Sequence, residues 1–218
     1  MNLKRRIPQY ILGLVLMAFG LVFIKRLQMG ISPISSVPDA ISMVTPFTLG
    51  NVTIAFHVVC VIGQIIVNKK PTLRIILTLP LAIGFGYLID FFVWIMDYTI
   101  DPLWLRLVLL VPGIIVSALG VVLIVGADLM LPAPDAFMRT ISAVYKIPLS
   151  KVKTTGDIIW VTTSVIIDLS CTGTLHSVGL GTVCTALFVG KCIGLFNKYF
   201  PNLNMPPLVF ENKKKSDS

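Results

Sequence analysis

The sequence predicts an all-α membrane protein with six transmembrane helices, arranged as two inverted repeats of three helices each. The chain is 56% hydrophobic, and only 13% of its 218 residues are charged, whereas soluble domains average about 25% charged residues. The chain also repeats itself: an apolar helix, a Pro-containing break and a Pro-Asp-Ala sequence occur once after Gly20 and again after Gly120. Two related halves of this kind are typical of small transporters.

Six apolar segments are close to the length of about 20 residues that a helix needs to cross a bilayer. The first follows a basic N-terminus and ends at Lys25-Arg26 without a small-residue cleavage site, so we interpret it as a retained span rather than a signal peptide. The fifth is the shortest. The predicted spans are 8–26, 51–68, 73–96, 103–126, 155–171 and 178–198. They form one polytopic domain over residues 1–200, followed by a polar, Lys-rich tail at 201–218.

The basic residues predict the orientation of these spans. If the N-terminus is cytoplasmic, 14 of the 18 Lys and Arg residues lie on the inner side, three lie outside, and Lys191 lies within a span. Because cytoplasmic loops carry an excess of Lys and Arg, we expect both termini in the cytoplasm. The repeats would cover 8–96 and 103–198, and three spans per repeat place the two halves in opposite orientations.

A Pro-Asp segment interrupts each half. Proline lacks an N–H and clashes with the preceding turn, so helices should break at Ser32-Pro33 and at Pro132-Ala133-Pro134. Pro38 and Pro134 suit the first position of a new helix, which would place Asp39 and Asp135 in the first turn. Two interpretations stay open: interfacial helices that join spans, or re-entrant segments that bind a solute. The solute-binding residues would then be Ser32, Ser35, Ser36, Asp39, Asp135 and Thr155.

Four ionisable residues lie inside the predicted spans, where charge is costly and often functional. His57 and Asp157 occupy matching repeat positions, so they could form a proton-coupling pair or be satisfied separately by neighbouring helices. Asp90 and Lys191 could form an ion pair, although Lys191 could instead reach the inner surface.

Several functions are not supported by the sequence. It contains no phosphate-binding loop, zinc-protease motif or nucleophile elbow, so we predict neither an enzyme nor a cofactor. The basic residues flank apolar spans, which argues against nucleic acid as a partner. The four cysteines have no metal-site spacing and no clustered histidines, so no metal site is expected.

The motifs resemble those of the YczE/YitT-like family of bacterial membrane proteins. The resemblance rests on GISPISSVPDAI with the Gly50-led second span, and on GADLMLPAPDAFMRTIS, SKVKTTGD and LGTVCTALFVGKCIGLFNKYF, and it covers about residues 8–200. It implies a multi-pass protein of the bacterial cytoplasmic membrane and no catalytic residue. The chain departs from the family at Met130-Leu131-Pro132, where a glycine or small-residue turn would be expected.

We therefore expect a small secondary transporter or exporter whose solute binds between the two repeats. A solute-capture subunit of a larger complex and a non-transporting scaffold or regulator are the alternatives. The expected partners are the lipid bilayer, an unidentified small solute and a second copy of the chain. Gly13 and Gly20, with Gly84 and Gly86, offer close-packing faces for such a homodimer.

Overall fold

The computed structural model describes residues 3–70 and 72–203, and this part of the chain is helical with no strands. The predicted all-helical class is confirmed. The tail predicted at 201–218 lies outside the described residues from 204 onward. The helices are α1 (Leu3–Arg26), α2 (Pro33–Val44), α3 (Leu49–Asn68), α4 (Leu73–Ile95), α5 (Leu103–Ala127), α6 (Ala133–Tyr145), α7 (Leu149–Cys171), α8 (Leu180–Tyr199) and the short 3-10 helix η1 (Pro201–Leu203).

Five helices are long and apolar enough to cross a membrane: α1, α3, α4, α5 and α8. A helix suits this environment because it satisfies its backbone hydrogen bonds within the segment. The predicted fifth span corresponds to α7, which is 23 residues long. Asp157, Asp168 and several threonines make α7 more polar than the other long helices. The protein is thus a multi-pass, membrane-type helical protein with five candidate spans.

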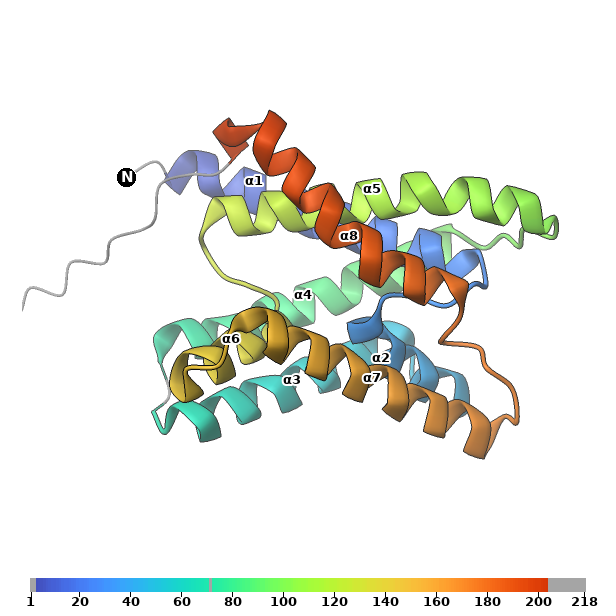
Figure 1. Ribbon diagram of the computed structural model, residues 1–218, viewed down its shortest axis with the longest axis horizontal. Helices are drawn as coiled ribbons and strands as arrows, with labels where there is room; N and C mark the ends of the chain where they lie inside the picture. The colour runs from blue at the N-terminus through green and yellow to red at the C-terminus, as the bar shows by residue number, and fades with distance from the viewer. Residues whose placement is uncertain (1–2, 71, 204–218) are drawn as a thin grey trace, which may run out of the picture.

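The six long helices lie along the long axis of the molecule and alternate in direction (Figure 1). The start of α1 and the end of α8 lie at the same end, together with the α3–α4, α5–α6 and α6–α7 connections (Figure 1). We call this the basic end, because these segments carry most of the described Lys and Arg residues. The other end holds the α4–α5 and α7–α8 connections and both connections to α2 (Figure 1).

The two halves exchange their short helices. Helix α2 of the first half packs mainly against α7 of the second, and α6 of the second half packs mainly against α3 of the first. Helices α1 and α5 share the most extensive interface, with α4 beside α1 and α8 beside α5. One difference breaks this correspondence: α4 packs closely against α3, whereas α8 is separated from α7.

Glycines allow α1 and α5 to approach closely. A Cβ added to Gly120 would lie 2.6 Å from the backbone nitrogen of Met17, and one added to Gly13 would lie 2.9 Å from the carbonyl oxygen of Gly120. Gly20 faces Ser117 of α5 in the same way. The face predicted for a homodimer at Gly13 and Gly20 is therefore covered within the chain.

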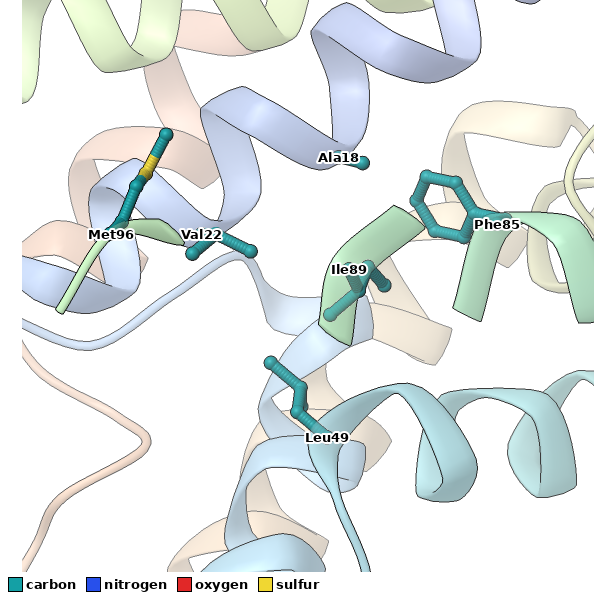
Figure 2. Close-up of a cluster of buried hydrophobic side chains, with 6 residues drawn as sticks. All are labelled: Ala18, Val22, Leu49, Phe85, Ile89 and Met96. Carbon is teal, nitrogen blue, oxygen red and sulfur yellow. The ribbon is translucent and has the colours of Figure 1, made fainter. Parts of the chain in front are cut away.

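A buried cluster fixes the neighbouring helices around α1. Ala18 and Val22 of α1 meet Phe85 and Ile89 of α4, with Leu49 from the start of α3 and Met96 beyond α4 (Figure 2). Ala18, Val22 and Ile89 are fully buried. This core holds α1, α4 and the start of α3 together.

Both short helices begin inside the molecule and run outward to opposite ends (Figure 1). The predicted start of the first at Pro38 is wrong: α2 begins at Pro33, so Asp39 is its seventh residue and lies outside the first turn. Pro33 already provides a favourable start, because its missing N–H is not needed there. The second begins at Ala133, with Asp135 in the first turn as predicted.

Backbone hydrogen bonds join the segment between α1 and α2 to the α7–α8 connection and the start of α8. The backbone N–H of Ile31 donates to the Ser177 carbonyl at 3.2 Å, and the Gly181 N–H donates to the Met29 carbonyl at 2.7 Å. Gly30 has a φ of 82°, a left-handed conformation that favours glycine. The chain can therefore turn sharply after α1 and return to the interior.

Candidate functional site

A pocket of about 480 Å³ lies at the basic end, between the two halves. Helices α3 and α4 of the first half form one wall, and α5, the 128–132 connection and α6 of the second half form the other. This volume falls within the range of about 300–1,000 Å³ that is usual for small-molecule sites. The polar lining residues are Gln64, Asn68, Thr72, Thr78, Asp128, Arg139 and Thr140.

The end of α3 positions the first polar wall. Lys69 adopts a left-handed conformation with φ 55°, which ends the helix and turns the chain towards α4. The Asn68 side-chain amide donates to the Lys70 carbonyl at 3.1 Å and to the Thr72 hydroxyl at 3.3 Å. The short α3–α4 connection is thereby fixed at the mouth of the pocket.

Gln64 links this wall to α6. Its side chain is only 2% exposed, and its amide nitrogen donates to the Ala133 carbonyl at 3.1 Å. Ala133 is the first residue of α6. Because an amide buried without a hydrogen bond would cost free energy, this contact fixes the start of α6 against α3.

Two charged side chains from the described part of the chain line the pocket. Asp128 ends α5 in a left-handed conformation and lies 3.9 Å from the Arg6 guanidinium, which also donates to the Ala127 carbonyl at 2.8 Å. Arg139 projects from α6, is exposed, and forms no ion pair within the described part of the chain. The acid of the pocket is thus paired, and its arginine is available to a ligand.

His57 lies deeper, beside a cavity of about 10 Å³, which is the space of about one water molecule. The His57 side chain is 5% exposed and stacks on the Phe85 ring, with centroids 5.9 Å apart and planes at 4°. Its Nδ1 has no hydrogen-bond partner among the described residues. Thr78 and Leu131 line both spaces, so the cavity lies directly behind the pocket.

The serines predicted to bind solute near the start of α2 do not line this pocket; their hydroxyls form hydrogen bonds within the protein. The Ser32 hydroxyl donates to that of Ser35 at 3.0 Å. Ser36 is fully buried; it donates to the Pro33 carbonyl at 2.7 Å and lies 2.7 Å from the Ser164 hydroxyl of α7. These contacts bring α2 and α7 together.

The two Pro-Asp carboxylates each have a lysine partner. Asp39 is 3% exposed and forms an ion pair with Lys25 at the end of α1. Asp135 lies 3.5 Å from Lys153, whose side chain is 53% exposed. Thr155 lies on the exposed surface of α7 and faces no pocket of the described structure.

The Asp90–Lys191 ion pair, one of the two alternatives for these residues, is not formed among the described residues. Asp90 accepts the Gly50 backbone N–H at 2.7 Å and the Thr48 hydroxyl at 2.6 Å, and it thereby stabilises the start of α3. Lys191 is exposed and lies over the Phe188 ring, 5.3 Å from its centroid. The two side chains project from helices that share no close packing.

His57 and Asp157 do not form a pair either. His57 lacks any hydrogen bond at Nδ1 within the described ranges, and Asp157 lies half-buried on α7, one helical turn after Lys153. Helices α3 and α7 meet through the Phe56 and Trp160 rings, 5.1 Å apart between centroids, and not through His57 and Asp157. The structure therefore agrees with the second alternative, in which each residue lies in its own surroundings.

Sequence reasoning missed the pocket residues of α3. Gln64 and Asn68 are four residues apart, so they share one face of a helix. Two amides on one face of an otherwise apolar segment are a signal that could have identified this wall. Asp168, near the end of α7, is fully buried and accepts the backbone N–H groups of His176 and Ser177.

A model of a protein family described only as a family of unknown function, DUF6198, matches residues 4–198. The chain belongs to this family. The match covers all eight α-helices apart from their outermost residues, and therefore the whole pocket. Neither the curated proteins nor the solved structures compared with the DUF6198 chain contain a match. The expectation of an uncharacterised family of membrane-type helical proteins is confirmed.

Proposed function

We propose that this DUF6198 protein is a small secondary transporter that binds its solute in the pocket at the basic end. The observation that carries the proposal is a pocket of ligand size whose walls come from both halves of a multi-pass helical protein. Transporters with internal repeats commonly bind their substrates at the interface of the repeats, next to interrupted helices.

Inverted repeats are part of the proposal. Their support is the exchange of short helices, in which α2 packs on α7 and α6 packs on α3. The polar contacts follow the same exchange. Ser164 meets Ser36 of α2, and Gln64, at the corresponding place in α3, meets Ala133 of α6. With α7 counted as a sixth span, each proposed repeat would have three spans.

The basic end faces the cytoplasm in this proposal. Lys69, Lys70 and Lys146 lie in its connections, and positively charged loops favour the cytoplasmic side. The pocket then opens inward. The buried Asp39–Lys25 ion pair lies towards the other end, where it contributes to a closed outer side. The exposed Asp135–Lys153 pair is its counterpart on the open inner side.

The relationship to the YczE/YitT-like bacterial proteins also belongs to this proposal. It is supported by the two Pro-Asp segments and by a match to an uncharacterised family over nearly the whole chain. Both termini would lie in the cytoplasm of a bacterial cell.

Solute flux into proteoliposomes tests the proposal. A metabolite library is first screened for thermal stabilisation of the purified protein, since a ligand at 100 times its dissociation constant stabilises a protein by about 2.7 kcal/mol. Flux of the stabilising solute is then compared between the wild type and Thr140→Trp, which fills the pocket. Thr162→Trp on the exposed face of α7 is the control.

Transport predicts flux for the wild type and for Thr162→Trp, and loss of flux for Thr140→Trp. Stabilisation without flux in any variant would contradict transport and favour a solute-capture subunit. Flux that Thr140→Trp leaves unchanged would place the pathway elsewhere.

A further inference from the structure

The charges of the pocket indicate which kind of solute it binds. Among the side chains that the structure describes, its charged lining residues are Asp128 and Arg139. Asp128 is already next to Arg6, whose side chain is only 6% exposed and is fixed by a hydrogen bond to the Ala127 carbonyl. The Arg6 guanidinium therefore neutralises the Asp128 carboxylate. The charge of Arg139 is not neutralised in this way, so the pocket carries an excess of positive charge.

From this charge distribution we infer that the pocket binds an anionic solute through a carboxylate or phosphate group held by Arg139. The inference rests on the proposed function of the same pocket. A guanidinium presents several N–H donors in one plane, which matches two oxygens of a carboxylate or phosphate.

The neutral wall opposite Arg139 can add a donor. The Thr72 hydroxyl accepts a hydrogen bond from the Asn68 amide, so its own hydrogen remains available to an anion. Thr78 and Thr140, in contrast, donate to carbonyls within their own helices, Ile75 at 2.5 Å and Ala136 at 2.9 Å. Thr72 and Arg139 thus present donors to the same space.

Several residues around the pocket at the basic end are also positively charged. Lys69 and Lys70 form the α3–α4 connection next to Asn68, and Lys4 and Arg5 begin α1 at the same end (Figure 1). A cleft surrounded by one sign of charge raises the local concentration of the opposite ion. Small anions would therefore be enriched where the pocket opens.

Binding to the purified protein in neutral detergent tests the inference. The probes are sodium acetate, sodium succinate and inorganic phosphate, with choline chloride as the cationic comparison, all at constant ionic strength. Dissociation constants come from the concentration dependence of the melting temperature. Arg139→Gln removes the proposed anchor, Arg139→Lys keeps its charge, and Lys151→Gln removes an exposed charge of α7 that does not line the pocket.

We expect at least one of the three anions to stabilise the wild type. Arg139→Gln should weaken that binding about tenfold or more, because a charge-assisted hydrogen bond is lost. Arg139→Lys should keep part of the affinity, and Lys151→Gln should change it less than about twofold, as expected for a distant screened charge. Equal affinity in Arg139→Gln or stabilisation by choline alone would overturn the inference. So would the absence of stabilisation both by the three soluble anions and by an anionic lipid.

A second arm separates a soluble anion from a lipid headgroup, which offers the same phosphate chemistry. The protein is placed in nanodiscs of phosphatidylglycerol or of phosphatidylcholine, and the phosphate and succinate titrations are repeated. Binding in both lipids supports a soluble ligand. Stabilisation that depends on phosphatidylglycerol and on Arg139, with no effect of the soluble anions, would keep the anion site and assign it to a lipid.

The inference and the proposed function can fail separately. Anion binding that depends on Arg139 without any flux contradicts transport and leaves the anion site intact. Flux of a cation that Thr140→Trp abolishes, without anion binding, supports transport and contradicts the anion site.

Discussion

Three acidic side chains within the helical part of this protein are held by specific partners. Asp39 pairs with Lys25, Asp90 accepts the Gly50 backbone N–H, and Asp168 accepts that of Ser177. A buried carboxylate without a partner is costly, so the partners of the buried Asp39 and Asp168 contribute to stability. This explains why residues that suggest function by their position in an apolar segment have structural roles here.

The buried Lys25–Asp39 pair should matter much more than its exposed counterpart. Replacing Lys25 with Met leaves Asp39, at 3% exposure, as an uncompensated buried charge, and we expect the free energy of unfolding to fall by about 3 to 5 kcal/mol. Unfolding in mixed detergent micelles, followed by circular dichroism, measures this change. Lys153→Met is the matched control and should cost less than about 1 kcal/mol, because Lys153 is exposed. Equal losses would contradict the assignment.

Replacing His57 should affect transport and leave thermal stability unchanged. Replacing it with Phe keeps a ring that stacks on Phe85 and removes a buried nitrogen without a partner, so we expect no loss of thermal stability. Flux of the solute should fall if His57 lies on its path behind the pocket. Melting temperature and flux are measured on the same preparation. A variant that is destabilised and still transports normally would assign His57 a purely structural role.

At the scale of helices, glycine positions decide which surfaces meet. Adding a methyl group at Gly120 would bring it 2.6 Å from the Met17 backbone, so Gly120→Ala should separate α1 from α5 and destabilise the protein. Gly190→Ala in α8 meets nothing within 4 Å and should be neutral or slightly stabilising, because alanine favours helix more than glycine does. Thermal unfolding of the two variants gives the comparison. A destabilised Gly190→Ala with an unaffected Gly120→Ala would show that α8, and not α1, needs its glycines for packing.

The helices were predictable because their apolar length and their prolines act locally. The start of α6 at Ala133 followed from Pro134 and Asp135. The start of α2 was misplaced because two prolines, Pro33 and Pro38, were both suitable, and the helix begins at the first. The pocket could not be predicted, since it depends on how Arg139 of α6 lies relative to α3 and α4, which no local pattern encodes.

At the scale of the whole molecule, the two halves differ in one contact. Helix α4 closes against α3, whereas α8 leaves α7 exposed, including Ile158, Ile159 and Ile166. Hydrophobic side chains on these surfaces suit a lipid environment. The central claim of the proposed function concerns orientation: the two halves would be opposed, and the pocket would open at the basic end, on the cytoplasmic side.

Labelling with a membrane-impermeant maleimide tests this claim most directly. Cys171 is exposed at the end of α7, at the end of the molecule opposite the pocket, and serves as a native reporter in the wild type. Thr140→Cys in a Cys171→Ser background places a thiol in the pocket. The account predicts that intact cells label Cys171 and leave the pocket thiol unlabelled, whereas inside-out vesicles label the pocket thiol and leave Cys171 unlabelled. The reverse pattern, or labelling of both thiols from one side, would contradict it.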